Sequence, residues 1–368
     1  MPNPQFDRLK VHMNPLANRA NKKEIERDHV SPDSQSHSLS ESTQATISRC
    51  ADRIRAARDT GSSVMMAFGA HTIKNGLAPV LAQLLEKGWV THLATNGAGI
   101  IHDWEFSFLG SSCEDVETMV KEGRFGNWQE TGYYINLALN VGASEGKGYG
   151  ESIGALIENE RLIIPEVAQL QQYVHDRIDL DPVACAAAAD LLHVIKSFDL
   201  SSGPMALPHR WKRFSIQAAA YRLSIPFTGH PMIGHDIIYN HPMNHCASLG
   251  RAAQRDFLSF AHAVSNLNGG VYMSIGSAVM SPMIFEKSLS IAQNVAITQG
   301  RRIEDYLIQV VDLAESNWDW SVGEPPEENP AYYLRYNKSF SRMGGELNYL
   351  QADNREFLLG LLGELEQS

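Results

Sequence analysis

One segment, residues 63–96, restricts the fold of this chain more than any other. An apolar run, SVMMAF, occupies residues 63–68, and a second run, WVTHLATN, occupies residues 89–96. Between them, apolar residues recur at helical spacing at Leu77, Val80, Leu81, Leu84 and Leu85. Such a strand, helix and strand cross over right-handed, which makes the two strands parallel. The sequence therefore predicts an α/β protein with a mostly parallel sheet.

The α/β pattern is interrupted by a helical segment and then resumes. Residues 111–213 carry helical periodicity and predict a helical insertion. Strand-like residues then return at 224–229 and 269–276, each followed by a segment with helical periodicity. We expect residues 41–368 to form a single α/β domain with a Rossmann-like sheet. Its ligand cleft should lie at the carboxyl ends of the strands. The polar residues 1–40 predict an N-terminal arm that crosses another surface or is partly disordered.

Charge and apolar content narrow the class of protein. The formal net charge is −11, so we expect no nucleic-acid partner, and a cationic partner fits better. No run approaches the ~18 apolar residues that span a bilayer, and no secretory signal is visible, so we expect a cytoplasmic protein without a membrane partner. The cysteines are widely spaced and form no CxxC pair, which argues against a disulfide framework or a cysteine zinc site.

Two turns rich in small residues could bind a nucleotide. In the first, a predicted strand ends at Thr95 and is followed by Asn96 and Gly97, and Asp103 and Glu105 could accept hydrogen bonds from ribose hydroxyls. This segment is equally compatible with a tight turn whose aspartate caps a helix. The second turn follows the strand at 269–276 and contains Gly276, Ser277 and Ala278. Two such turns in one sheet could meet over one ligand, although close packing of helix on sheet also explains the small residues.

A loop rich in histidine, residues 230–245, is the third candidate. His230, His235, His241 and His245 lie near Asp236, but their spacing matches no HExxH pattern. One interpretation is a metal site in a hydrolase or lyase. A substrate loop with one or two working imidazoles is favoured, because histidine changes charge near neutral pH. Surface histidines without a function are the third interpretation.

Four segments together resemble deoxyhypusine synthases. Residues 69–105, GAHTIKNGLAPVLAQLLEKGWVTHLATNGAGIIHDWE, resemble the early NAD-binding segment of that family. Three later segments resemble further pieces of the family in collinear order: RFSIQAAAYRLSIPFTGHPMIGHDIIYNHP, FAHAVSNLNGGVYMSIGSAVMSP and YLQADNREFLLGLL. The resemblance covers about half of the chain. It implies a Rossmann-like sheet of the deoxyhypusine synthase type that binds NAD.

The resemblance also implies a chemistry and a set of site residues. Members of the family use NAD as hydride acceptor and donor, and pass the aminobutyl group of spermidine through an enzyme lysine imine. They are homotetramers, so we expect a homo-oligomer, either a dimer or a tetramer. Asp236 and His241 would lie on the substrate side. The cofactor site would be lined by Thr95, Asn96, Gly97, Asp103, Gly276, Ser277, Ala278 and Asp353.

One departure from the family pattern changes the expected chemistry. Asn244 stands where the family has its catalytic lysine, and no lysine occurs between Lys212 and Lys287. The amide nitrogen of asparagine is not nucleophilic and cannot form an imine. We therefore expect a deoxyhypusine synthase-like transferase with altered chemistry that acts on a small amine or polyamine-like substrate. Its cofactor would be NAD, with His241 or His235 moving protons and Asp236 holding a cationic group. A metal-dependent hydrolase or lyase and a non-catalytic ligand-binding homologue are the alternatives.

Overall fold

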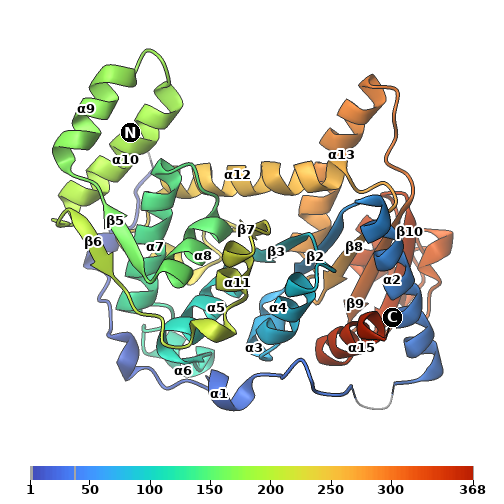
Figure 1. Ribbon diagram of the computed structural model, residues 1–368. Helices are drawn as coiled ribbons and strands as arrows, with labels where there is room; N and C mark the ends of the chain where they lie inside the picture. The colour runs from blue at the N-terminus through green and yellow to red at the C-terminus, as the bar shows by residue number, and fades with distance from the viewer. Residues whose placement is uncertain (1–2, 37–38, 368) are drawn as a thin grey trace.

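A parallel six-stranded sheet forms the centre of the protein (Figure 1). The computed structural model describes residues 3–36 and 39–367. Both strands expected in residues 63–96 are present and pair in parallel, so the predicted fold class is confirmed. The strands of the sheet are β2 (Val64–Phe68), β3 (His92–Asn96), β7 (Phe227–His230), β8 (Gly270–Ile275), β9 (Tyr306–Asp312) and β10 (Glu346–Gln351).

The order of the strands is that of a Rossmann sheet. Across the sheet they follow β10-β9-β8-β2-β3-β7, and every neighbouring pair is parallel. Along the chain, β2, β3 and β7 follow one another toward one edge of the sheet. The chain then returns to place β8 on the other side of β2, and β9 and β10 extend the sheet to the opposite edge. The direction of winding reverses between β2 and β8. In open α/β sheets, ligands bind outside the carboxyl ends of the strands at this switch point.

Helices bury both faces of the sheet, which explains why the sequences of its central strands are continuously apolar. Val64, Met66 and Phe68 of β2 face one core, while Met65 and Ala67 face the other. The first core is completed by helices that include α2 (Glu41–Thr60), α4 (Ala78–Glu86), α5 (Gly97–Leu109), α11 (Ile216–Arg222) and α15 (Asn354–Glu366). The second is completed by α12 (Cys246–Ser265), α13 (Met280–Thr298) and α14 (Arg335–Phe340).

The insertion between β3 and β7 is mostly helical, as the periodicity predicts. Its helices are α6 (Val116–Lys121), α7 (Gln129–Ser144), α8 (Tyr149–Asn159), α9 (Val167–Arg177) and α10 (Pro182–Ser197). The α9–α10 hairpin projects from the body of the protein (Figure 1). The sequence did not predict the antiparallel pair of β5 (Arg161–Ile164) and β6 (Gly203–Ala206). Glu160 ends α8 in a left-handed conformation, with φ of +54°, and β5 begins at the next residue.

The described part of the N-terminal arm lies along the surface of the domain. Its elements are η1 (Arg8–Lys10), η2 (Leu16–Asn18), β1 (Lys23–Glu24) and α1 (Ile25–Asp28). Strand β1 pairs antiparallel with β4 (Ser111–Ser112). The guanidinium of Arg19 donates to both carboxylate oxygens of Glu105 at 2.8 and 2.6 Å, and both side chains are buried. A buried ion pair therefore fastens the arm to α5.

The remaining short elements are α3 (Ala70–Lys74), η3 (Lys212–Phe214), η4 (Ile237–Asn240), η5 (Trp320–Val322) and η6 (Pro330–Tyr333). Across residues 3–36 and 39–367, no helix is both long and apolar enough to span a membrane.

Candidate functional site

Three segments meet at the switch point between β2 and β8. The Gly69 amide donates to the Ile275 carbonyl at 3.1 Å, and a Cβ at Gly69 would overlap the Gly276 carbonyl oxygen. Gly276 has a φ of +55° and lies against the side chain of Asn354. Asn354 in turn donates from Nδ2 to Thr72 Oγ1 at 3.1 Å. The β2–α3 turn, the β8–α13 turn and the start of α15 therefore form one surface, and Gly69 and Gly276 permit the close approach.

Helix ends at this edge of the sheet differ in whether a side chain caps them. Helix α5 is capped by Asn96, which accepts from Gly99 N at 2.9 Å, and α15 is capped by Asp353, which accepts from Arg355 N. Helices α3 and α13, which flank the switch point, have no side-chain hydrogen bond from their N-cap residues, Gly69 and Val279, although Ser277 Oγ accepts from Ser281 N in the first turn of α13. Uncapped first-turn N–H groups suit phosphate oxygens, and the helix dipole favours negative charge there.

The structure brings the Thr95 and Gly276 turns to the same edge of the sheet. Thr95 and Ile275 both lie opposite Phe68 in register, so the two turns flank β2 at about 10 Å, twice the spacing of neighbouring strands. Thr95 itself is fully buried, and its Oγ1 donates to the Phe68 carbonyl at 2.8 Å. The side chain of Thr95 therefore holds two strands together. In the second turn, Ser277 Oγ accepts from Ser281 N at 3.2 Å, whereas Ala278 is exposed.

Asp103 does not fit the ribose contact expected of it. Its carboxylate is 1% exposed and accepts from Ser215 Oγ at 2.6 Å, from Ile216 N at 3.1 Å and from Gln217 Nε2 at 2.9 Å. Burial raises the pKa of Asp103, and these hydrogen bonds oppose the rise. The carboxylate caps α11 inside the domain, which is the helix-capping interpretation that the sequence left open.

A second group of polar atoms lies beside the first helix turn of α5. The carboxylate of Asp236 fills the space that a Cβ on Gly97 would need. Its Oδ2 is buried without a hydrogen-bond partner in the structure, as are the hydroxyls of Tyr149 and Tyr239. Burial raises the pKa of Tyr149 and of Tyr239, and the negative charge of Asp236 raises both pKa values further. We call Asp236, Tyr149 and Tyr239 the acid cluster.

The acid cluster is arranged to accept a cation. Burial raises the pKa of Asp236 to about 6, although the charge of His235 and the Met232 backbone N–H oppose the rise. A carboxylate oxygen buried without a partner is costly, and an ammonium group would supply a charge and an N–H donor to Asp236 Oδ2. Since Gly97 begins the helix that follows β3, the cluster lies at the same edge of the sheet as the switch point.

The histidines of residues 230–245 do not converge. His230 ends β7 and bonds to Thr228, His235 is exposed, and His245 lies beside His193. The ring of His241 is buried, with Nδ1 accepting from Met243 N at 2.9 Å, and burial lowers its pKa to about 4. In the part of the chain that the structure describes, no three His, Cys, Asp or Glu side chains are grouped to hold a metal ion. The geometry therefore gives the metal-dependent alternative no support.

Asn244, the residue that the family resemblance aligns with a lysine, is part of the buried framework. It is 4% exposed, donates from Nδ2 to Asn136 Oδ1 at 2.9 Å and accepts from Arg8 Nη1 at 3.1 Å. A side-chain amide held in this way does not supply a nucleophile.

Comparisons with known proteins give structural neighbours only. No family model matches the chain, and no curated protein matches it in sequence. A conserved LOR/SDH-type protein from Methanococcus maripaludis S2 aligns with 92% of this chain and 74% of its own, at 15% identity and a TM-score of 0.45. AgrE, solved with ornithine and NAD+, aligns with 89% of this chain at 15% identity and a TM-score of 0.43. ArgZ, an arginine dihydrolase from cyanobacteria, aligns with 88% at 15% identity and a TM-score of 0.40. This chain spans about a third of the length of AgrE and ArgZ. The strand order, rather than these alignments, defines the fold.

Sequence reasoning missed four residues of the site. Gly69 and Asn354 lie at the switch point, and Tyr149 and Tyr239 belong to the acid cluster. A glycine directly after a predicted strand was a usable signal for Gly69. The two tyrosines gave none, because only the packing of α8 and η4 reveals that their hydroxyls lack partners.

Proposed function

We propose that the protein is an enzyme that binds an NAD-type dinucleotide and acts on a small amine. The observation that carries the proposal is the switch point of a Rossmann-ordered sheet, flanked by the starts of α3 and α13, at the same edge as the Asp236 carboxylate. Among the described residues, Asp236 Oδ2 has no hydrogen-bond partner. Either feature alone is compatible with simple packing. Together they provide a place for a phosphate and a place for an ammonium group at one edge of the sheet.

Separate groups of residues would bind the cofactor and the substrate. The glycine turns at Gly69 and Gly276 and the exposed Ala278 would lie against the dinucleotide, and Asn354 would hold the two turns in position. The bound cofactor supplies a hydride acceptor. Asp236 would hold the substrate ammonium group, and Tyr149 and Tyr239 would orient it. His235, which is exposed and close enough to lower the pKa of Asp236, is the group proposed to move a proton.

Aminobutyl transfer through a lysine imine is the finer possibility raised by the family resemblance. Asn244 cannot form the imine, so transfer would need another lysine. Lys74 ends α3 beside the switch point, whereas Lys287 lies on α13 and pairs with Glu286. Release of reduced cofactor on incubation with NAD and a diamine, unchanged in Lys74→Met, would favour simple oxidation. Loss of all turnover in Lys74→Met, with NAD binding retained, would favour transfer.

Placing a negative charge at the start of α13 tests the cofactor site. Because Ala278 is exposed, Ala278→Glu is tolerated by the fold, and its carboxylate would repel a cofactor phosphate. We expect the affinity for NAD, measured by calorimetry, to fall at least about tenfold, while Ala278→Gln retains most of it. Failure of the unmodified protein to bind millimolar NAD would contradict the proposal. An equal loss in both variants would contradict the placement of a phosphate at this helix.

A further inference from the structure

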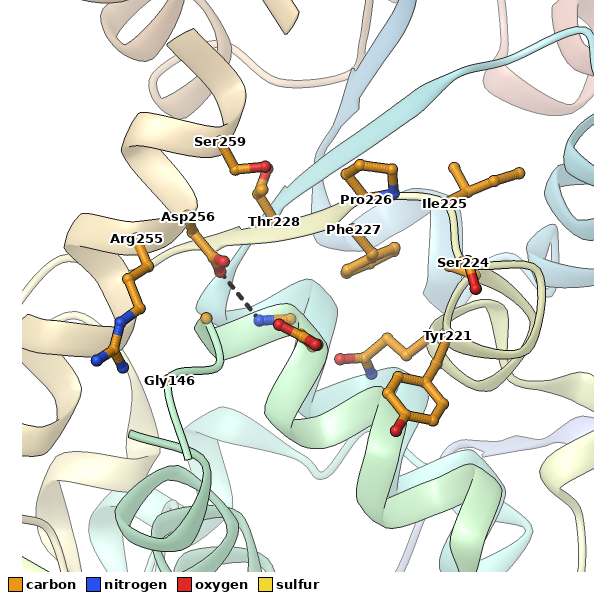
Figure 2. Close-up of a pocket in the computed structure, with 15 residues that line it drawn as sticks. Gly146, Tyr221, Ser224, Ile225, Pro226, Phe227, Thr228, Arg255, Asp256 and Ser259 are labelled. Carbon is orange, nitrogen blue, oxygen red and sulfur yellow. Dashed lines mark hydrogen bonds between the residues drawn. The ribbon is translucent and has the colours of Figure 1, made fainter. Parts of the chain in front are cut away.

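A cavity of about 640 Å³ lies away from the switch point, beside the amino end of edge strand β7 (Figure 2). Its walls come from the α7–α8 loop and from α8, α11, α12 and the residues that lead into β7. It shares no residue with the acid cluster or with the two glycine turns. We propose that this cavity is a second small-molecule site, built for a zwitterionic compound that carries an ammonium and a carboxylate on an apolar chain. This inference does not depend on the proposed function.

The walls of the cavity are fixed by a buried carboxylate. Asp256 is 4% exposed, and its Oδ2 accepts from Gly229 N at 2.7 Å and from Gly150 N at 3.0 Å. Figure 2 shows the bond to Gly150 at the start of α8. One side chain of α12 therefore clamps the edge strand to a helix terminus, which leaves the cavity preformed. A preformed site binds a ligand without the cost of ordering its walls.

One end of the cavity offers acceptors without donors. Gln217 is 1% exposed, and its Nε2 donates to Ile100 O and Asp103 Oδ2, but its Oε1 has no hydrogen-bond partner among the residues that the structure describes. Tyr221 lies one helical turn further along α11, so both residues line the cavity from one helix face. The carboxylate of Glu151 lines the same cavity. An unpartnered amide oxygen, a carboxylate and an aromatic ring are the groups that bind an ammonium.

The other end offers a fixed cation. Arg255 donates from Nη1 to the carbonyls of Ala143 and Lys147, at 2.9 and 3.2 Å, which holds the guanidinium on the α7–α8 loop. Across residues 3–36 and 39–367, its other nitrogens have no hydrogen bond to the protein. Figure 2 shows Arg255 beside Gly146 at one side of the cavity and Tyr221 at the opposite side. A guanidinium held in this way suits a carboxylate.

Apolar side chains also line the cavity. They are Ile225, Pro226 and Phe227, and Figure 2 shows them on the side of Tyr221 and Ser224, away from Arg255. Methylene groups would pack against these residues, whereas a compact ion would leave them unfilled. The polar groups on the two sides and the apolar part of the wall together select an amino acid with its two charged groups apart, rather than an inorganic ion or a simple amine.

Calorimetry with three compounds that have the same carbon chain tests the site. These are 5-aminopentanoate, pentylamine, which lacks the carboxylate, and pentanoate, which lacks the amine. The titrations use the full chain carrying Asp236→Asn, so that an amine bound at the acid cluster does not contribute. We expect 5-aminopentanoate to bind, and each of the two compounds with a single charge to bind at least about tenfold more weakly.

Four variants locate the binding. Glu151→Gln and Arg255→Gln should each weaken the binding of 5-aminopentanoate at least about tenfold, and Ser259→Trp, which fills the cavity, should abolish it. Glu158→Gln, on the same helix α8 but outside the cavity, should leave it unchanged. Absence of heat with millimolar 5-aminopentanoate, equal affinity for pentylamine, or binding that survives Ser259→Trp would overturn the proposal. NAD binding by Ser259→Trp should equal that of the unmodified protein, so this test and that of the proposed function fail independently.

Discussion

Replacing Arg19 by methionine is expected to lower the free energy of unfolding by about 3–5 kcal/mol, because the change leaves a buried carboxylate without its cation. The Glu105 carboxylate also accepts from Ser112 Oγ at 2.5 Å and Thr131 Oγ1 at 2.9 Å, and both its oxygens lie inside the domain. These hydroxyls do not neutralise its charge. Urea denaturation at neutral pH measures the loss.

The dependence of this loss on pH has a definite sign. Burial raises the pKa of Glu105, but the charge and hydrogen bonds of Arg19 outweigh it, so that the pKa lies below its ordinary value. A group of this kind stabilises the fold above the pKa of the unfolded chain, and its contribution is lost as the pH falls through the folded pKa. The difference between Arg19→Met and the unmodified protein should therefore shrink below about pH 4.

Two controls separate the buried charge from general damage to the arm. Arg27→Met removes an exposed ion pair with Asp28 and should change stability little. Adding Glu105→Gln to Arg19→Met removes the uncompensated charge and should restore part of the lost stability. A loss in Arg27→Met as large as that in Arg19→Met, or no loss in Arg19→Met, would show that the ion pair does not fasten the arm.

Neutralising Asp236 is expected to stabilise the protein while weakening its binding of amines. The pKa of Asp236 is raised to about 6, so the ionised form is disfavoured by the fold and costs stability as the pH rises from about 4 through 6. At pH 8, Asp236→Asn should therefore raise the free energy of unfolding by about 2 kcal/mol, and at pH 4 the two proteins should be equally stable. Thermal denaturation at the two pH values measures both effects.

Ionised Asp236 lowers the stability of the protein, but it should strengthen the binding of an amine. An ammonium group binds the ionised carboxylate, so the affinity of the unmodified protein for a diamine should rise with pH through about 6. Asp236→Asn should weaken that affinity at least about tenfold and remove its pH dependence. Asp59→Asn, on the exposed face of α2, should alter neither stability nor affinity. A variant Asp236→Asn that is less stable at pH 8, or that binds the diamine normally, would show that the acid cluster is not a binding site.

The sequence suggested candidate site residues that follow strand ends, and did not suggest those that depend on packing between distant helices. Gly276 was named because a small-residue turn after a buried strand is a local signal, and its contact with a cofactor stays a prediction. Asp236 was placed on the substrate side through the family resemblance, but its unpartnered oxygen was not foreseeable. Asp103 was misassigned, because an aspartate early in a helix looks the same in sequence whether it faces a ligand or the next helix. Here Ser215 and Gln217, more than a hundred residues away, bind it.

The sequence by itself determined the α/β class, the parallel pairing of β2 and β3 and the helical insertion, since these depend on local periodicity and on the handedness of a short crossover. Only the tertiary structure decided the strand order β10-β9-β8-β2-β3-β7, which places Gly69 against Gly276, and the grouping of Asp236 with Tyr149 and Tyr239. The reason is physical: apolar periodicity shows that a strand or helix is buried, but not which neighbour buries it. Whether a buried polar atom has a hydrogen-bond partner therefore depends on which neighbour packs against it.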